Sequence, residues 1–250
     1  MKGRVLIVVS GADKVTLTNG KFYETGFWLN ELAGPLKRFL DAGMDVDFTS
    51  PDGKKPSIDP NSLKMITGGR RDEDLKLVKS MDRLWSPVPL ADWELPRLDP
   101  YSAIFIPGGH APMADLWMDP DLGEILLHFH KNNKPTIAIC HGPAAFLSTL
   151  EPNGCLLYKG YQMTCYSNLE EQLMEHMGVV PGPVPFYVAD ELRNHGIIVS
   201  NRLFSFLPHV VRDREVITGQ DPFAADKLGE EAVKMINDWI GLQTPYLSEP

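Results

Sequence analysis

Cys140 is the residue of this 250-residue chain whose surroundings most favour chemical reactivity. It follows the short apolar run Thr136–Ile139 and is followed by His141, Gly142 and a proline, after which the sequence favours a helix. A buried strand that turns directly into a helix has the geometry of a nucleophile elbow, and Gly142 lets the backbone pass close to that helix. The amides and dipole of the helix N-terminus would favour a thiolate. We therefore interpret Cys140 as a nucleophile, although a free cysteine is more often a small core residue.

A second abrupt turn, Pro107-Gly108-Gly109-His110, lies about thirty residues earlier and ends the apolar run Ile104–Ile106. Neither run alternates with polar residues, which is typical of strands buried on both faces of a parallel sheet. Strands alternating with helices along the chain predict an α/β fold, a three-layer sandwich with a mostly parallel central sheet. Strands are expected at Arg4–Val9, Asp45–Thr49, Ala103–Pro107, Thr136–Ile139 and Tyr161–Tyr166, with strand or mixed pieces at Phe186–Leu192, Ile197–Ser200, Leu203–Phe206 and Arg214–Thr218. Helices are expected at Thr25–Ala42, Asp119–Asn132, Pro143–Leu150, Leu169–Met177 and Ala224–Ile240, and a polar loop at Ser10–Lys21.

Residues 54–100 are the least regular part of the chain. They contain a Gly-Gly-Arg-Arg break, a short helix expected at Asp72–Met81 and the proline-rich segment Ser86–Pro100. A segment of this kind usually builds the rim of a site or an interface. We interpret it as an irregular insertion in a single domain spanning residues 1–250, because its apolar residues are too sparse for a core of its own.

Composition narrows the class of protein. Apolar residues make up 43% of the chain, enough for a core, and the net charge of −9 makes nucleic acid and anionic membranes poor partners. No apolar run approaches the roughly 18 residues of a membrane span, and Val5–Val9 is too short for a signal peptide. Cys140, Cys155 and Cys165 show no C-x-x-C spacing, which argues against a disulfide framework or a zinc site. We interpret Cys155 and Cys165 as structural and the chain as cytoplasmic.

The Pro107–His110 turn and the sequence Ala138–Leu147 together resemble the ThiJ/PfpI superfamily, whose flavodoxin-like fold is shared with class I glutamine amidotransferases. The branch most resembled is heat-shock protein 31, whose members are described as chaperones and as cofactor-independent glyoxalases (glyoxalase III). The similarity extends to Glu24–Phe27, Leu32–Pro35, the segment from Ala42 to Pro51, and Thr218–Pro222.

The resemblance places a carboxylic acid from the first long helix against the cysteine sulfur, and Glu31, four residues before Pro35, matches that position. On a helical wheel Glu31 lies at the edge of an apolar stripe that includes Trp28 and Leu32, a position that fits either an inward-facing carboxyl group or the solvated carboxylate that is commoner on a helix. The inward orientation of Glu31 is what the resemblance implies. Beside apolar groups and a thiolate its carboxyl group should stay protonated, because desolvation and like charge both raise its pKa. It would then shuttle a proton during attack by the thiolate.

His141 is the second partner that the resemblance implies for Cys140. The family pairs this histidine with a later acidic residue, for which Glu170 and Glu171 are available and Glu171 is favoured by spacing. A carboxylate that orients an imidazole follows the logic of a catalytic triad. The alternative is a histidine that points away from Cys140, as neighbours at a turn often do.

The expected site also includes an oxyanion hole, whereas no metal or nucleotide site is predicted. The backbone amides of Gly109 and His141 would form an oxyanion hole. His110 matches a histidine that binds a metal in some members of the branch, but the accompanying His and Glu ligands have no match here, so no metal is predicted. His128 and His130 would lie on different faces of a helix and form a weak ligand pair. Neither G-x-G-x-x-G nor G-x-x-x-x-G-K-[ST] occurs, so no nucleotide or other cofactor is predicted.

The resemblance implies a cysteine enzyme that acts on small 2-oxoaldehydes, such as a glutathione-independent glyoxalase (a hydro-lyase) converting methylglyoxal to lactate. Deglycase action and cysteine peptidase or amidase action are alternatives at the same site. A different interpretation is a holding chaperone or redox stress sensor, in which Cys140 is an oxidation switch and unfolded proteins are the clients. Family members are generally dimers, so a homodimer is expected.

Overall fold

The structure is a computed structural model that describes residues 2–65, 69–203 and 207–243. Within these residues a seven-stranded sheet has the order β10-β11-β7-β6-β1-β4-β5, and its neighbouring strands pair in parallel except β10 with β11. This confirms the predicted α/β class with a mostly parallel sheet. The strands are β1 (Arg4–Val8), β4 (Asp45–Ser50), β5 (Val88–Pro89), β6 (Ala103–Ile106), β7 (Thr136–Ile139), β10 (Val210–Asp213) and β11 (Val216–Gly219).

The two strands that carry the site lie at the centre of the sheet. Every residue of β6 and β7 is buried, as their unbroken apolar runs predict. Their parallel register pairs Ile106 with Ala138. The turns that follow these strands therefore lie side by side at the carboxyl edge of the sheet, where open α/β sheets bind ligands.

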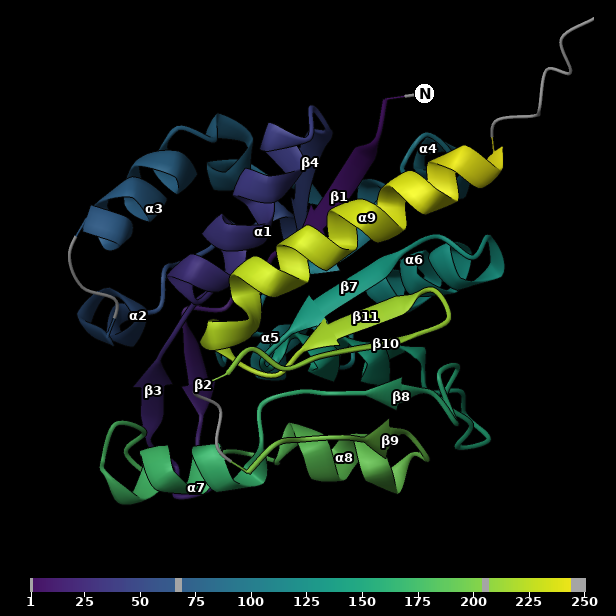
Figure 1. Ribbon diagram of the computed structural model, residues 1–250. Coiled ribbons are helices and arrows are strands. Elements are labelled where there is room, and N and C mark those ends of the chain that lie inside the picture. Colours follow the sequence, from purple (N-terminus) through teal and green to yellow (C-terminus); the bar gives the residue numbers. More distant parts are fainter. Residues whose placement is uncertain (1, 66–68, 204–206, 244–250) are drawn as a thin grey trace, which may run out of the picture.

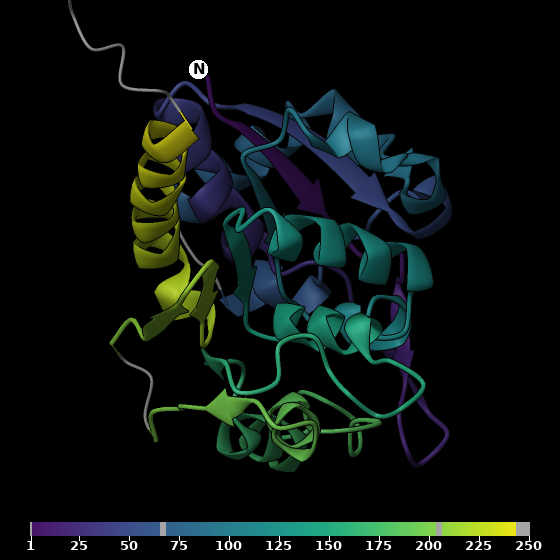
Figure 2. The same cartoon turned by 90° about the vertical axis from the view of Figure 1, so that its right-hand side faces the viewer.

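Helices cover both faces of the sheet (Figure 1). α1 (Leu29–Asp41) and α9 (Ala225–Gln243) pack together on one face, while α6 (Pro120–Lys131) and the 3-10 helix Gly142–Thr149 cover the other (Figure 2). Alternate residues of the central strands contribute to two buried apolar clusters, one beneath each helical layer. α9 approaches α1 closely because residue 229 is glycine: a Cβ there would lie 2.8 Å from the Cα of Pro35. This packing fixes the position of α1, and with it that of Glu31.

The prediction of a polar loop at Ser10–Lys21 is wrong, because part of this segment forms a β-hairpin. β2 (Lys14–Thr16) pairs antiparallel with β3 (Phe22–Glu24). The turn contains Asn19-Gly20, a dipeptide favoured in such turns, and Gly20 has a φ of 79°. The Thr18 amide donates to the carbonyl of Pro183 at 3.0 Å, which ties the hairpin to the loop after α7 (Asn168–His176).

The segment 54–100 is more regular than predicted. It contains α2 (Pro60–Met65), α3 (Gly69–Lys79) and the short α4 (Leu95–Leu98), of which α3 overlaps the predicted helix Asp72–Met81. Its strand β5 pairs with β4 at the edge of the sheet. The segment thus supplies an edge strand of the central sheet as well as surface helices.

Several later elements also differ from the prediction. The mixed segment predicted at Phe186–Leu192 is α8 (Val188–Asn194), whose buried residues have helical spacing, and the helix predicted at Pro143–Leu150 is 3-10 in type. The strand predicted at Tyr161–Tyr166 is reduced to β8 (Gln162–Met163), which pairs with β9 (Ile198–Val199). Residues 204–206 of the segment Leu203–Phe206 lie outside the described residues. The remaining short helix is α5 (Pro112–Asp115); across the described residues, no helix combines the length and apolar character needed to cross a bilayer.

Candidate active site

Cys140 directly follows β7 and has a left-handed backbone conformation with a φ of 60°. Residues with a Cβ seldom adopt this conformation, and where they do the strain often marks a functional site. Two hydrogen bonds hold the residue there: its amide donates to the carbonyl of Gly219 at 3.0 Å, and its carbonyl accepts from the amide of Tyr166 at 2.8 Å. The predicted elbow is therefore present, and the cysteine is almost completely buried.

Glu31 reaches the same position from α1. The space between the two side chains requires glycine at position 108, because a Cβ there would lie 2.6 Å from the Cβ of Cys140 and even closer to Oε2 of Glu31. Glu31 is fully buried, and neither of its carboxyl oxygens has a hydrogen-bond partner of normal geometry in the described residues. Burial raises the pKa of Glu31 well above its ordinary value, although the neighbouring Cys140 acts in the opposite direction. The structure thus places an inward-facing, protonated carboxyl group beside the sulfur.

The charge of the Cys140 sulfur differs from the prediction. Burial and the neighbouring Glu31 raise the pKa of Cys140 well above its ordinary value, and the Gly109 amide beside the sulfur only partly offsets them. The prediction of a thiolate favoured by the helix N-terminus is therefore wrong for the resting site, because desolvation of the charge outweighs the local dipoles. A thiolate must form by transfer of the proton to a base. Of the predicted oxyanion hole, the Gly109 amide is located beside the sulfur, and the part assigned to the His141 amide stays a prediction.

His141 is oriented to be that base. Its Nδ1 atom lies 3.2 Å from Sγ of Cys140, and its Nε2 atom lies 2.5 Å from Oε2 of Glu171. Burial and the neighbouring His110 lower the pKa of His141, so the ring is neutral. Because Nε2 faces a carboxylate and donates to it, Nδ1 carries the lone pair that can accept the thiol proton.

Glu171, the acid favoured from spacing, is the one that contacts His141. Burial alone would raise the pKa of Glu171, but His110 and His141 outweigh burial and hold it far below its ordinary value. Glu170 is engaged elsewhere, because it forms a capping box with Ser167 at the start of α7 and accepts a hydrogen bond from Gln220 at 2.9 Å.

His110 has a place in this cluster that the sequence did not reveal. Its Nε2 atom lies 2.9 Å from Oε1 of Glu171, and its ring centroid lies 4.1 Å from that of His141. Burial alone would lower the pKa of His110, but the charge and hydrogen bond of Glu171 raise it above its ordinary value. Tyr23 of the hairpin packs edge-on against this ring, with centroids 5.1 Å apart. The result is two imidazoles that share a single carboxylate, one with a raised pKa and one with a lowered pKa.

Comparison with known proteins places this site in a family. The DJ-1/PfpI family model matches residues 22–235. The chain belongs to the DJ-1/PfpI family. It is 31% identical over 243 residues to the protein/nucleic acid deglycase HchA of Staphylococcus aureus (strain MSSA476), a match that covers 94% of this chain and 81% of that protein. The predicted ThiJ/PfpI membership, in the heat-shock-protein-31-like branch, is thereby confirmed.

Two solved structures share the fold. The Francisella tularensis Rapid Encystment Protein 24 kDa matches with a TM-score of 0.80 at 28% identity, over 94% of this chain and 99% of that chain. Glyoxalase III from Candida albicans matches with a TM-score of 0.75 at 21% identity, over 93% and 97% of the two chains. At that identity the second match shows a common fold alone.

A cavity of about 690 Å³ opens onto the cluster of Cys140, His141, His110 and Glu171 in this DJ-1/PfpI chain, the candidate catalytic cluster. Its inner end is lined by Cys140, His110, His141 and the Gly109 backbone. Tyr166 also lines it and packs on His141, with ring centroids 4.7 Å apart. A small carbonyl compound in this cavity would therefore meet the sulfur, the imidazoles and an amide donor together.

His110, His141 and Glu171 are also the described residues best placed to hold a metal ion, since three of their donor atoms lie within 4.8 Å of one another. The same three side chains are hydrogen-bonded to each other, and both histidine Nε2 atoms face the carboxylate. A metal would have to replace these hydrogen bonds. The absence of a metal from the functional site stays a prediction.

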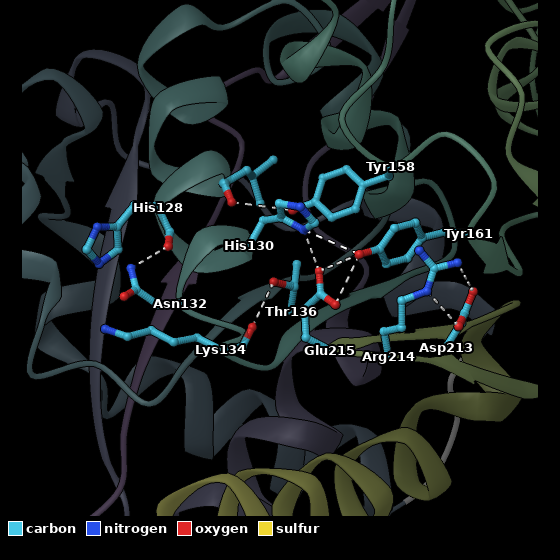
Figure 3. Close-up of polar contacts among 11 residues, drawn as sticks. His128, His130, Asn132, Lys134, Thr136, Tyr158, Tyr161, Asp213, Arg214 and Glu215 are labelled. Atoms are coloured by element: carbon cyan, nitrogen blue, oxygen red, sulfur yellow. Dashed lines mark hydrogen bonds and ion pairs between the residues drawn. The ribbon is translucent and has the colours of Figure 1, made fainter. Parts of the chain in front are cut away.

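The other predicted candidates lie away from this cluster. Nδ1 of His130 lies 2.6 Å from Oε1 of Glu215, whereas Nε2 of His128 lies 3.5 Å from Oδ1 of Asp99. The two histidines therefore turn to different sides of α6 (Figure 3). The prediction that they lie on different faces of the helix is confirmed. Cys165 is buried in the core, and burial raises its pKa to about 12. Cys155 is exposed and follows the turn after the 3-10 helix, and its interpretation as structural stays a prediction.

Replacing His110 by Asn is expected to shift the pH dependence of Cys140 reactivity. After burial, the neighbouring His110 is the main cause of the lowered pKa of His141, so its removal should raise that pKa and move the acidic limb of the profile to higher pH. The rate of alkylation of Cys140 by iodoacetamide, measured against pH, checks this without any substrate. His176→Asn, at the exposed end of α7, is the control. An unchanged acidic limb in His110→Asn would show that the two rings are not coupled.

Proposed function

We propose that this chain is a cofactor-independent cysteine enzyme that converts small 2-oxoaldehydes to 2-hydroxy acids, with methylglyoxal to lactate as the type reaction. The observation that carries the proposal is the buried Cys140 thiol between a neutral imidazole and a protonated carboxyl group. The relative named a deglycase lends support, because a deglycase also acts on carbonyl adducts.

The first step forms a bond between sulfur and carbon. His141 accepts the thiol proton at Nδ1, and the resulting thiolate attacks the aldehyde carbon. The aldehyde oxygen becomes an alkoxide, which the Gly109 amide is placed to stabilise, and it takes the proton back to give a hemithioacetal. Glu171 holds the imidazolium that forms in between.

The second step is an internal redox change. A proton leaves the former aldehyde carbon and the ketone oxygen is protonated, which gives an enediol. The hydroxyl group on the first carbon then loses its proton as the former ketone carbon gains one, so the first carbon is oxidised and the second is reduced. Glu31 and His141 flank the sulfur and are the groups placed to move these protons. The product is a thioester of the 2-hydroxy acid on Cys140. One water molecule hydrolyses this thioester, and the reaction needs no external oxidant or reductant.

The direct test is lactate formation from methylglyoxal in the absence of glutathione. Wild-type protein is expected to form lactate, and protein blocked at Cys140 with iodoacetamide is expected to form none. In D2O the lactate should carry deuterium at carbon 2 if a solvent-exchanging group moves the proton. A wild-type protein that alkylates at Cys140 but forms no lactate would contradict the proposal and favour the holding chaperone or stress sensor.

The same Cys140–His141–Glu171 arrangement favours two related activities. Attack by the thiolate on an aldehyde adduct of a protein side chain would be deglycase action, and attack on an amide carbon would be peptidase or amidase action. Adding a glycated peptide and an unmodified peptide to the lactate assay separates the three. We propose the reducing cytoplasm as the compartment, which fits three free cysteines, and a homodimer as the assembly, which rests on the family resemblance.

A further inference from the structure

The outer wall of the catalytic cavity is an apolar face of α7 that does not pack into the core. Leu169, Leu173 and Met177 follow one another at four-residue spacing and line the cavity, yet 46%, 54% and 64% of their surfaces are exposed. A helical stripe of this kind normally faces a core. Here the same helix buries Glu171 in the catalytic cluster and turns its apolar stripe to the space in front of the sulfur.

Most of the remaining lining is also apolar, with Glu170 and Asp221 as its acidic members. Met174 and Val180 continue the apolar surface of α7 and its following loop, and Trp28 adds an aromatic surface from the N-terminal end of α1. Among the described residues that line the cavity, none is Lys or Arg. Such a wall offers no partner for a phosphate or carboxylate group on a substrate, whereas it would bury an uncharged chain or ring.

The size of the cavity points in the same direction. A volume of about 690 Å³ falls in the range of sites that enclose drug-sized ligands. A three-carbon aldehyde bonded to Cys140 would fill only the inner end, beside His110 and His141. The α7 wall would then stay in contact with water, although it is continuous with the space that holds the reacting carbonyl.

We propose that the α7 wall is a subsite for an apolar arm of the substrate, so that the preferred substrates are 2-oxoaldehydes whose ketone carbon carries an alkyl chain or an aryl ring. This inference rests on the proposed function and deepens it. The arm lies along Leu169, Leu173 and Met177 while the aldehyde carbon meets the sulfur. Contacts of the arm with this wall supply binding energy that positions the reacting carbons. A substrate with an apolar arm should therefore have a higher kcat/KM.

A chain-length series tests this subsite. The kcat/KM for hydroxy-acid formation is compared for methylglyoxal, propylglyoxal, hexylglyoxal and phenylglyoxal. In the wild type we expect a rise of roughly fourfold for each of the first few added methylenes. In Leu173→Gln and in Met177→Gln the ratio of hexylglyoxal to methylglyoxal should fall at least tenfold. Met118→Gln is the matched control: Met118 is exposed to 65%, as Met177 is to 64%, but it lies outside the cavity, and its ratio should equal that of the wild type.

The outcomes separate the subsite from the proposed function. If the wild type turns over methylglyoxal but shows no gain with chain length, the subsite is refuted and the proposed function stands. If no member of the series is turned over although Cys140 alkylates, the proposed function fails and the subsite with it. A ratio that stays at the wild-type value in both α7 variants would overturn the inference even if wild type shows the gain. If the α7 variants change oligomeric state while the ratio of kcat/KM for hexylglyoxal to methylglyoxal stays unchanged, the wall is an interface with a second copy of the chain.

Discussion

Lactate formation from methylglyoxal is expected to fall by about three orders of magnitude or more when Cys140 is replaced by Ala. The sulfur supplies the covalent intermediate, and no other nucleophilic side chain of the described residues is placed with it between Glu31 and His141. Loss of the nucleophile removes the contribution of the whole cluster, because the base and the acid act on the covalent adduct that the sulfur forms. Single-turnover and steady-state assays of lactate, without glutathione, measure the loss.

Cys155→Ala is the matched control for this variant. Cys155 is exposed and remote from the cluster, so its loss should leave the rate within about twofold of the wild type. Suppression of client aggregation, measured on the same samples, separates the two classes of function. If Cys140→Ala retains full lactate formation, the thiol has no part in the reaction. If lactate formation is lost and aggregation is still suppressed, a holding activity exists beside the enzyme and does not need the cysteine.

Replacing Glu31 by Gln is expected to slow the enzyme and to stabilise the fold. The Gln side chain keeps the size of Glu31, but its amide cannot give up and recover a proton, so lactate formation should fall by about a hundredfold. The thiol of Cys140 should also ionise more easily, because the neighbouring Glu31 is one cause of its raised pKa. Lactate assays and the pH dependence of alkylation measure the two effects.

The stabilising effect of Glu31→Gln should grow with pH. Burial raises the pKa of Glu31 in the folded state, so the wild type is penalised as pH rises above the ordinary glutamate value of about 4.3 and the unfolded chain releases this proton. The free energy of unfolding of the wild type, relative to the variant, should therefore fall by up to about 1.4 kcal/mol per pH unit until the folded-state pKa is reached. Below pH 4 the two proteins should differ little.

Denaturant unfolding of both proteins between pH 4 and pH 8 checks this sign. Glu124→Gln, at an exposed carboxylate of α6, is the control and should show no such trend. A Glu31→Gln variant that is less stable than the wild type at pH 8 would mean that the carboxyl group is ionised and well solvated in the folded protein. A substitution that lowers activity and raises stability is expected where a site keeps a group in an environment that destabilises the fold but serves the reaction.

The local sequence determined the parts of this protein that depend on neighbours along the chain. The apolar runs before Pro107 and Cys140 specify strands buried on both faces, and the small residues that follow specify the turns. The stripe on α1 placed Glu31 at its edge, and the resemblance predicted that its carboxyl group faces inward. The resemblance, which rests on the same short motifs, predicted the family and the Glu171 contact with His141, and it proposed Cys140 as the nucleophile.

Only the tertiary structure decided which distant groups meet and what their charges become. His110 and Glu171 are 61 residues apart, and their contact depends on where α7 lies against the β6 turn, which no local pattern encodes. The hairpin that supports His110 was hidden in a polar stretch, because short strands with one exposed face lack a strong apolar signal. The resting state of Cys140 was predicted wrongly for a related reason: a turn motif indicates the helix dipole, but burial and Glu31 come from the whole fold, and their effect on the charge of the sulfur is larger.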